Sequence, residues 1–178
     1  ELEFYRDTKN WEAASKMIPE VQTFMDHKPS RIPQDYRILL SFQFAFVLFQ
    51  KRKYEEALDW AGIIIFGKFG NARLDIQQFA RLLNLMIHYE LKNEMVLKYG
   101  IQSTRRFLGK TRDIKPLERI LLRFFGRLVT KASGDHPVVF QKLYQELYQG
   151  DAVLVDDEVE DFLALRSWII RHARSIHI

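Results

Sequence analysis

The chain has 178 residues with a formal net charge of +4; 47% of the residues are hydrophobic, 28% are charged and none is cysteine. This composition predicts a single globular domain, 1–178, and excludes a disordered or fibrous chain; no apolar run approaches the roughly 18 residues that a membrane helix needs. The lack of cysteine excludes disulfides, thiolate zinc sites and cysteine nucleophiles, and it fits a reducing compartment, so we expect a cytoplasmic protein.

Helical periodicity dominates the chain, and no segment makes a convincing strand. The first helix is expected to begin after a capping Asp7 or Thr8 and to run to about Asp26. Pro19 should kink this helix or split it in two, because proline lacks the N–H that a helix interior requires. The connection 27–33 follows, with two prolines and a serine.

The most apolar segment is predicted to be a helix from Tyr36 to Gln50. Its side chains are apolar nearly all round, so we expect neighbouring helices to cover it on every side. Tyr54 to Phe66 is expected to be its partner helix. The glycines of 67–70 should end that partner, because glycine readily takes a positive φ.

The C-terminal half of the chain is also predicted to be helical. The expected helices are 72–91, 94–108, 114–131, 136–148 and 156–174. Acids lie in the first turn of the last helix and bases in its last turn, which suits the helix dipole at both ends. Grouped into hairpins, the expected units are 1–28, 33–66, 72–109 and 114–150, followed by the terminal helix 156–174.

A short sequence step recurs along the chain. Trp11-Glu12-Ala13-Ala14 and Tyr54-Glu55-Glu56-Ala57 each open a predicted helix, 43 residues apart. A two-helix unit recurring at such a period indicates an α-solenoid, whose units stack because none can bury its apolar face alone. We therefore expect an all-α, right-handed α-solenoid of about four irregular hairpins.

The step Tyr54-x-x-Ala57 resembles the tetratricopeptide repeat (TPR) family, and this match puts Ala45 at the family's small position in the first helix. The resemblance implies TPR-like hairpins that touch at these alanines. The next unit departs from the family pattern, because Met86 replaces the small residue and Lys98 falls near the alanine position. The chain also resembles the helical tails of large uncharacterised bacterial proteins, which implies a bacterial source and no particular activity.

The chain begins at Glu1 without Met, and its acidic and aromatic first residues do not resemble a signal peptide. The first recognisable element reads as the second half of a hairpin. We therefore expect the chain to be the C-terminal part of a longer protein.

The sequence favours a non-catalytic protein-interaction scaffold or regulatory module over an enzyme. It contains no phosphate-binding glycine loop, dinucleotide fingerprint or nucleophile elbow, so neither catalysis nor a cofactor is expected. The acids of 156–161 match neither an EF-hand nor a zinc motif, so no metal is expected.

The TPR resemblance implies a groove lined by helices 36–50, 72–91 and 116–131. The groove would receive a protein or peptide partner, or a second copy of the chain. Its expected contact residues are Gln43, Phe46, Asn84, Arg123 and Arg127. The alternative is that the apolar residues of these helices belong to the buried core, because aromatic side chains are more often buried than exposed.

A basic segment provides the alternative function, RNA binding. Residues 105–131 include nine Lys or Arg and two acids, a local net charge of +7. Besides Arg123 and Arg127, the candidate contacts are Arg105, Arg106, Lys115, Arg119 and Lys131. Clustered cations of this kind attract phosphates. The neighbouring aromatics have core spacing, however, and seven acids in 146–161 are available to pair with the cations, so a solvated or internally paired surface is the competing interpretation.

Overall fold

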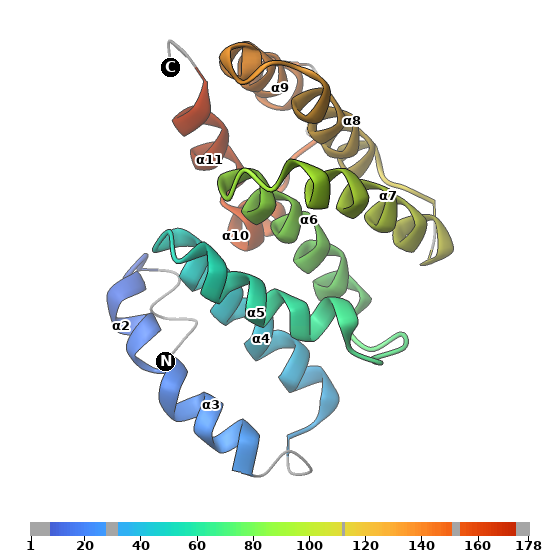
Figure 1. The fold of residues 1–178 in the computed structure, drawn as a ribbon. Helices are drawn as coiled ribbons and strands as arrows, with labels where there is room; N and C mark the ends of the chain where they lie inside the picture. Colours follow the sequence, from blue (N-terminus) through green and yellow to red (C-terminus); the bar gives the residue numbers. More distant parts are fainter. Residues whose placement is uncertain (1–7, 28–31, 112, 151–153, 174–178) are drawn as a thin grey trace. The chain divides into compact units, whose positions relative to one another are not determined.

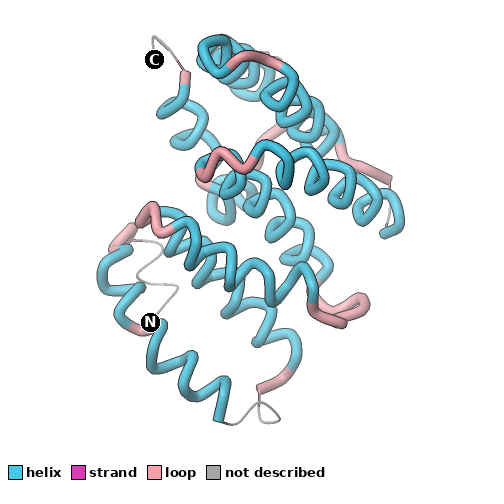
Figure 2. Tube along the Cα trace, viewed as in Figure 1, coloured by secondary structure: helices cyan, strands magenta, loops and turns pink. Residues whose placement is uncertain are grey.

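The structure is a computed structural model, and it describes residues 8–27, 32–111, 113–150 and 154–173 (Figure 1). Within these ranges every regular element is a helix and none is a strand (Figure 2), as the sequence predicted. The chain divides into two compact units, unit 1 (1–92) and unit 2 (93–178), which are described separately. The sequence predicted a single domain and a solenoid. Both predictions depend on how the two units associate, and both stay predictions.

The helices of unit 1 lie close to the predicted ranges, and the partner helix has the same bounds as expected. They are α2 (Trp11–Lys16), α3 (Ile18–His27), α4 (Gln34–Gln50), α5 (Tyr54–Phe66) and α6 (Leu74–Glu90).

The first predicted helix is split, as Pro19 suggested. The break falls at Met17, and the proline lies in the first turn of α3, where its missing N–H costs no helical hydrogen bond. The predicted cap was wrong for Thr8, because Asn10 caps α2 by accepting a backbone N–H at 3.1 Å. Asp7, the other predicted cap, lies outside the described residues.

Helix α4 is the centre of unit 1. Its residues Ser41–Phe49 are buried without interruption. Helices α2, α5 and α6 all pack against it, which agrees with its apolar character on every side. Ala45 of α4 and Ala57 of α5 are both fully buried, and their small side chains suit the close packing of these two helices.

Three turns that precede helices share an unusual backbone conformation. Lys9, Arg52 and Lys92 have φ values of 53°, 60° and 57°, in the left-handed region that non-glycine residues rarely occupy. After the first two of these residues, Asn10 and Lys53 also have nearly equal angles, with φ of −84° and −88° and ψ of 69° and 66°. The same turn therefore recurs where the chain enters α2 and α5.

We predict that Arg52→Gly stabilises the protein. The turn after α4 is a Schellman motif, with backbone bonds from Arg52 to Phe49 (3.0 Å) and from Lys53 to Leu48 (2.9 Å). Glycine at the left-handed position removes the steric cost of Cβ and should raise the free energy of unfolding by about 0.5–1 kcal/mol. Arg52→Ala keeps the Cβ and is the control. Equal stabilities of the two variants in urea unfolding would contradict the prediction.

The loop after α5 uses its glycines in two ways. Gly70 has a φ of +54°, as predicted. Gly67 does not, because its backbone is extended, with φ −70° and ψ 154°. The constraint at Gly67 is space: a Cβ there would lie 2.6 Å from the Ile63 carbonyl oxygen and would overlap the Phe69 ring.

Gly67→Ala is therefore expected to destabilise the protein by about 1–3 kcal/mol, because the Ile63 carbonyl is backbone and cannot rotate away. Gly62→Ala is the matched control inside α5. Its Cβ would meet only the Phe66 ring, at 3.7 Å, so the better helix propensity of alanine should add about 0.5–1 kcal/mol. Thermal unfolding of both variants checks the opposite signs, and a stable Gly67→Ala protein would refute the steric argument.

In unit 2, α8 packs against both α7 and α9, and α11 packs against α9 and α10. The boundary between the units, after Lys92, divides the predicted hairpin 72–109. The helices of unit 2 are α7 (Glu94–Thr111), α8 (Pro116–Thr130), the short 3₁₀ helix η2 (Ser133–Asp135), α9 (His136–Tyr148), α10 (Asp157–Leu163) and α11 (Leu165–His172).

An aromatic cluster holds α8, α9 and α11 together. Trp168 is fully buried, and its ring centroid lies 6.0 Å from those of Phe124 and Phe125 and 5.0 Å from that of Phe140. The His172 ring stacks on Phe140 at 4.8 Å. Edge-to-face and tilted contacts of this kind add to the free energy gained by burying the rings.

The terminal helix 156–174 was predicted as one element, and this was wrong. Ala164 adopts a left-handed conformation (φ 47°, ψ 42°) and separates α10 from α11. The first N–H groups of α11 have no partner within that helix. The Glu160 carboxylate accepts one of them, the backbone N–H of Arg166, at 3.2 Å. Arg174, the predicted end of this helix, lies outside the described residues.

Candidate functional site

The predicted groove residues have different surroundings. Gln43 and Phe46 are buried in α4, at 7% and 3% exposed. Phe46 meets the edge of the Trp11 ring at 5.7 Å, so α2 covers it. Neither side chain lines the groove that the structure shows in unit 1, and we therefore leave them out of the proposed binding surface. Asn84 is half-buried on α6.

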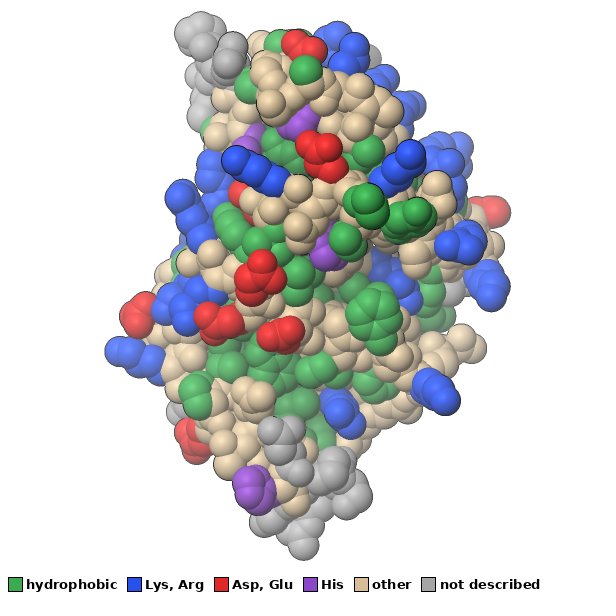
Figure 3. Space-filling model, in the orientation of Figure 1, with side chains coloured by type: hydrophobic (Ala, Val, Ile, Leu, Met, Phe, Trp, Pro, Cys, Tyr) green, Lys and Arg blue, Asp and Glu red, His purple; other side chains and the backbone are tan. Residues whose placement is uncertain are grey.

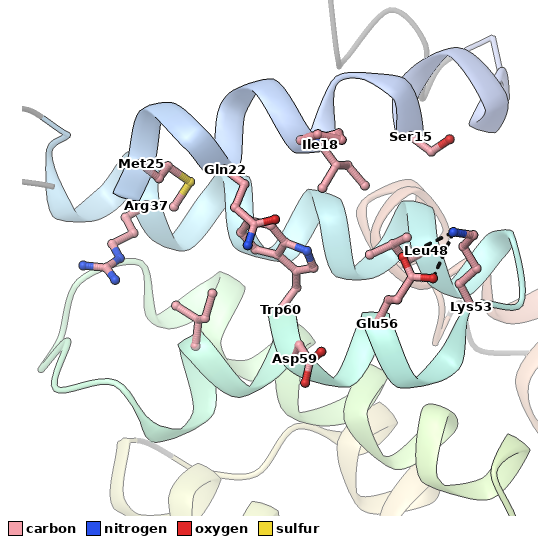
Figure 4. Close-up of a pocket in the computed structure, with 12 residues that line it drawn as sticks. Ser15, Ile18, Gln22, Met25, Arg37, Leu48, Lys53, Glu56, Asp59 and Trp60 are labelled. Carbon is pink, nitrogen blue, oxygen red and sulfur yellow. Dashed lines mark hydrogen bonds and ion pairs between the residues drawn. The ribbon is translucent and has the colours of Figure 1, made fainter. Parts of the chain in front are cut away.

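The structure instead places a groove in unit 1, between α3 on one side and α4 and α5 on the other (Figure 4). Its volume is about 370 Å³. The side chains that line it come from all three helices and from the end of α2. They are Ser15, Ile18, Pro19, Gln22, Met25, Arg37, Leu48, Lys53, Glu56, Asp59, Trp60 and Ile63.

The interior of this groove is apolar. Ile18 and Met25 approach from α3, and Leu48 and Trp60 approach from α4 and α5; all four are mostly buried. The Trp60 ring is held edge-on to Phe44 at 4.9 Å, so its position is fixed by the core. A rigid aromatic floor is typical of sites that anchor an apolar side chain of a partner.

The rim of the groove is charged with both signs. Lys53 pairs with Glu56 at 2.9 Å, three residues along α5 (Figure 4). Arg37 and Asp59 are exposed, and neither has an ion-pair partner among the described residues. The rim therefore offers one cation and one carboxylate to a bound molecule.

A small polar cluster holds α2 beside the groove. Lys51, just after α4, donates from Nζ to Glu12 Oε2 at 2.6 Å and to Ser15 Oγ at 2.8 Å. The hydrogen bond and the charge of Lys51 lower the pKa of the Glu12 carboxyl. The start of the groove is thus tied to the α4–α5 hairpin by hydrogen bonds as well as by packing.

The sequence analysis did not identify this groove. The signal was present in α3, where Ile18, Gln22 and Met25 recur at the spacing of one helix face. That pattern predicts only which face is turned inward. Whether the face meets its neighbour closely or leaves space depends on the angle at Met17, which no residue pattern specifies.

Figure 3 shows Lys and Arg side chains at many places on the surface. The basic segment lies in unit 2, and those of its cations that the structure describes are exposed. One of them is paired: Arg123 makes an ion pair with Glu146 of α9. Arg127 is exposed one turn further along α8. Arg112 lies outside the described residues. The other exposed candidates are Arg105, Arg106, Lys115, Arg119 and Lys131.

A second cavity, of about 420 Å³, lies beside this segment, where the chain passes from α7 to α8. Arg119 lines it and donates from Nη2 to the Ile114 carbonyl at 3.1 Å. Arg105 contributes a further guanidinium from α7. The full lining is Arg105, Asp113, Ile114, Arg119 and Leu122.

The acids near the C-terminus have local roles. Asp156 caps α10 by accepting the Val159 N–H at 2.9 Å. The Glu160 carboxylate accepts the Tyr148 hydroxyl as well as the Arg166 N–H. The Arg166 guanidinium lies over the Tyr148 ring, 5.3 Å from its centroid. These contacts join α9, α10 and α11. The acid that pairs with Arg123 of the basic segment is Glu146 of α9, not one of the acids of 156–161.

No group of three or more His, Asp or Glu side chains is arranged to hold a metal ion in the part of the chain that the structure describes. Among those same residues, no helix combines the length and the apolar run that crossing a bilayer requires. Two concave sites of the described chain are a mixed-charge apolar groove in unit 1 and a cationic cavity in unit 2.

Comparison of the chain with protein-family models, with curated proteins and with solved structures finds no match. The functional argument therefore rests on the geometry and the chemistry of the two sites. Both are binding surfaces in form, since each combines a depression with a few polar groups that fix orientation.

We predict that Tyr148→Phe lowers stability by about 1 kcal/mol, because the Glu160 carboxylate loses a half-buried donor. Burial, followed by the bond to Glu160, raises the pKa of the Tyr148 phenol well above its usual value. The folded state thus holds this proton more tightly than the unfolded state. The resulting stability is complete below about pH 10 and is lost as the pH rises further. The free energy of unfolding of the variant should therefore fall less steeply at alkaline pH than that of the wild type.

Urea unfolding at neutral and alkaline pH measures both effects. Tyr99→Phe is the control, because Tyr99 is exposed and the same change there should alter stability by less than about 0.5 kcal/mol. If the free energy of unfolding of Tyr148→Phe falls with alkaline pH as steeply as that of the wild type, the bond from Tyr148 to Glu160 does not contribute to folding as proposed.

Proposed function

We propose that the chain is a non-catalytic protein-interaction module, TPR-like in its hairpins, that binds a helical segment of a partner protein in the groove between α3 and α5. The observation that carries this proposal is the combination of a fixed apolar floor at Trp60 with a rim of both charges. An apolar centre and a polar rim are the usual anatomy of a protein interface.

The walls of the groove favour a helix over an extended peptide. All three walls are helices, whose backbone groups already bond within their own turns. An extended peptide would therefore bury backbone N–H and C=O groups with no partner, whereas a helix satisfies its own. The α3 wall has ten residues, a length of about 15 Å, which accommodates about three turns of a bound helix.

The rim charges indicate what the partner carries. Asp59 on α5 is suited to a Lys or Arg of the bound helix, and Arg37 at the start of α4 is suited to an acid. Apolar side chains at i, i+3 or i+4, and i+7 would enter the groove. The expected partner segment is therefore an amphipathic helix with a cation beside one edge of its apolar face.

The test is selection of binders from a displayed library of amphipathic helical peptides, followed by affinity measurement. Ile63→Glu puts a charge into the groove and should weaken the selected peptides at least tenfold. Ile65→Glu is the matched control, because Ile65 is also half-buried in α5 but does not line the groove. Asp59→Lys should weaken the peptides that carry a cation and spare those that do not.

Selected peptides whose binding falls equally in Ile63→Glu and Ile65→Glu would place the interaction elsewhere. A selection that yields no binder to the folded chain would reject the proposed groove. Circular dichroism of each variant confirms that the helices are retained.

A further inference from the structure

The exposed side of α7 combines cations with an aromatic residue. Tyr99 is 65% exposed and Met95 is 74% exposed, unusually high values for large apolar side chains. Arg106 and Lys110 are exposed further along the same helix. Tyr99 precedes the basic segment in the sequence, whereas Phe124 and Phe125 within it are buried.

Helix geometry puts these residues on one stripe. Tyr99 and Arg106 are seven residues apart, so they point within about 20° of each other and lie about 10 Å apart along the axis. Met95 and Lys110 continue the stripe in either direction. The buried residues of α7, Leu97, Ile101, Thr104 and Leu108, occupy the opposite side and leave this one open.

The cationic cavity lies beside α7 at Arg105, which points about 100° around the helix from Arg106 and so borders the stripe on one side. Arg119 of α8 and the carboxylate of Asp113 line the same cavity. The bond from Arg119 Nη2 to the Ile114 carbonyl fixes that guanidinium, and it uses only one of the five N–H donors of the group. The two guanidiniums outnumber the one carboxylate at this cavity, and each presents a planar fork of donors that suits a phosphate.

We propose that unit 2 binds single-stranded nucleic acid along α7, with a base stacked on Tyr99 and a phosphate bound by Arg105 and Arg119. A single strand is favoured over a duplex because a ring that projects from a helix can stack only on an unpaired base. Stacking aromatics beside a basic track are the usual means of sequence-tolerant recognition of single strands. Tyr99 is the stacking residue that the basic segment otherwise lacks.

The experiment measures the fluorescence anisotropy of labelled oligouridine and oligothymidine of about ten nucleotides with the whole chain, at about 50 and 200 mM salt. Arg105→Gln/Arg119→Gln should weaken binding at least tenfold. It should also flatten the plot of log affinity against log salt by about 0.7, since the two arginines share one phosphate and each phosphate contact on a single strand contributes about 0.7. Arg105→Gln alone leaves the Arg119 bond to Ile114 intact and should give about half of that change.

Tyr99 gives an independent readout. Tyr99→Ala should weaken binding about five- to 150-fold without changing the salt slope, because stacking releases no counterions. Tyr99→Phe retains a ring and should bind as the wild type does. The matched charge control is Lys142→Gln/Arg171→Gln, which removes two exposed cations of unit 2 that lie outside the stripe and the cavity.

Three results would overturn the proposal. One is no binding of either oligonucleotide at the lower salt concentration. Another is an equal loss in the cavity and control double variants, which would reduce the interaction to overall charge. The third is Tyr99-dependent binding to anionic phospholipid vesicles without binding to the oligonucleotides, which would identify a membrane surface. Binding of oligouridine alone, or of both oligonucleotides, supports the proposal and shows whether the 2′-hydroxyl contributes.

Discussion

The sequence of α4 imposes the main constraint on unit 1, because no side of this helix can face water along most of its length. Residues 41–49 are all buried, and they include four phenylalanines. Burial of each large apolar side chain is worth about 1.5–3 kcal/mol, so leaving one face of α4 uncovered would cost a large part of a domain's typical margin of stability. Covering it requires α2, α5 and α6 together. The groove lies where α3, which follows α2, faces α4 and α5.

Patterns within one helix were sufficient to predict the all-helical class and the bounds of most of the helices. The all-round apolar run of α4, the alanine pair Ala45 and Ala57, and the proline break near Met17 each have a local physical cause that the sequence displays. The break at Ala164 has none. Alanine is a strong helix former, and its left-handed conformation depends on the Glu160 carboxylate, whose bonds to Tyr148 and Arg166 form only in the folded chain.

The candidate sites were harder to predict, for a related reason. Sequence spacing identified the basic segment and its exposed cations, but it could not show that Arg105 and Arg119 line one cavity, because they belong to different helices. It assigned Gln43 and Phe46 to a binding face, whereas α2 covers Phe46. In both cases the deciding fact is the packing of one helix on another, which depends on interhelical angles that residue patterns do not encode.

Helix α3 is short, with only ten residues. A helix of that length is marginal on its own in water, and Ile18 and Met25 are its only buried side chains among those described. Its helical state therefore depends on what it packs against, and it should be among the first segments of unit 1 to exchange its amide hydrogens. A molecule that fills the groove would supply the missing contacts. Occupancy of the groove and the local folding of α3 are then linked equilibria, so that ligand binding would be visible as slowed exchange in a helix that lies beside the ligand.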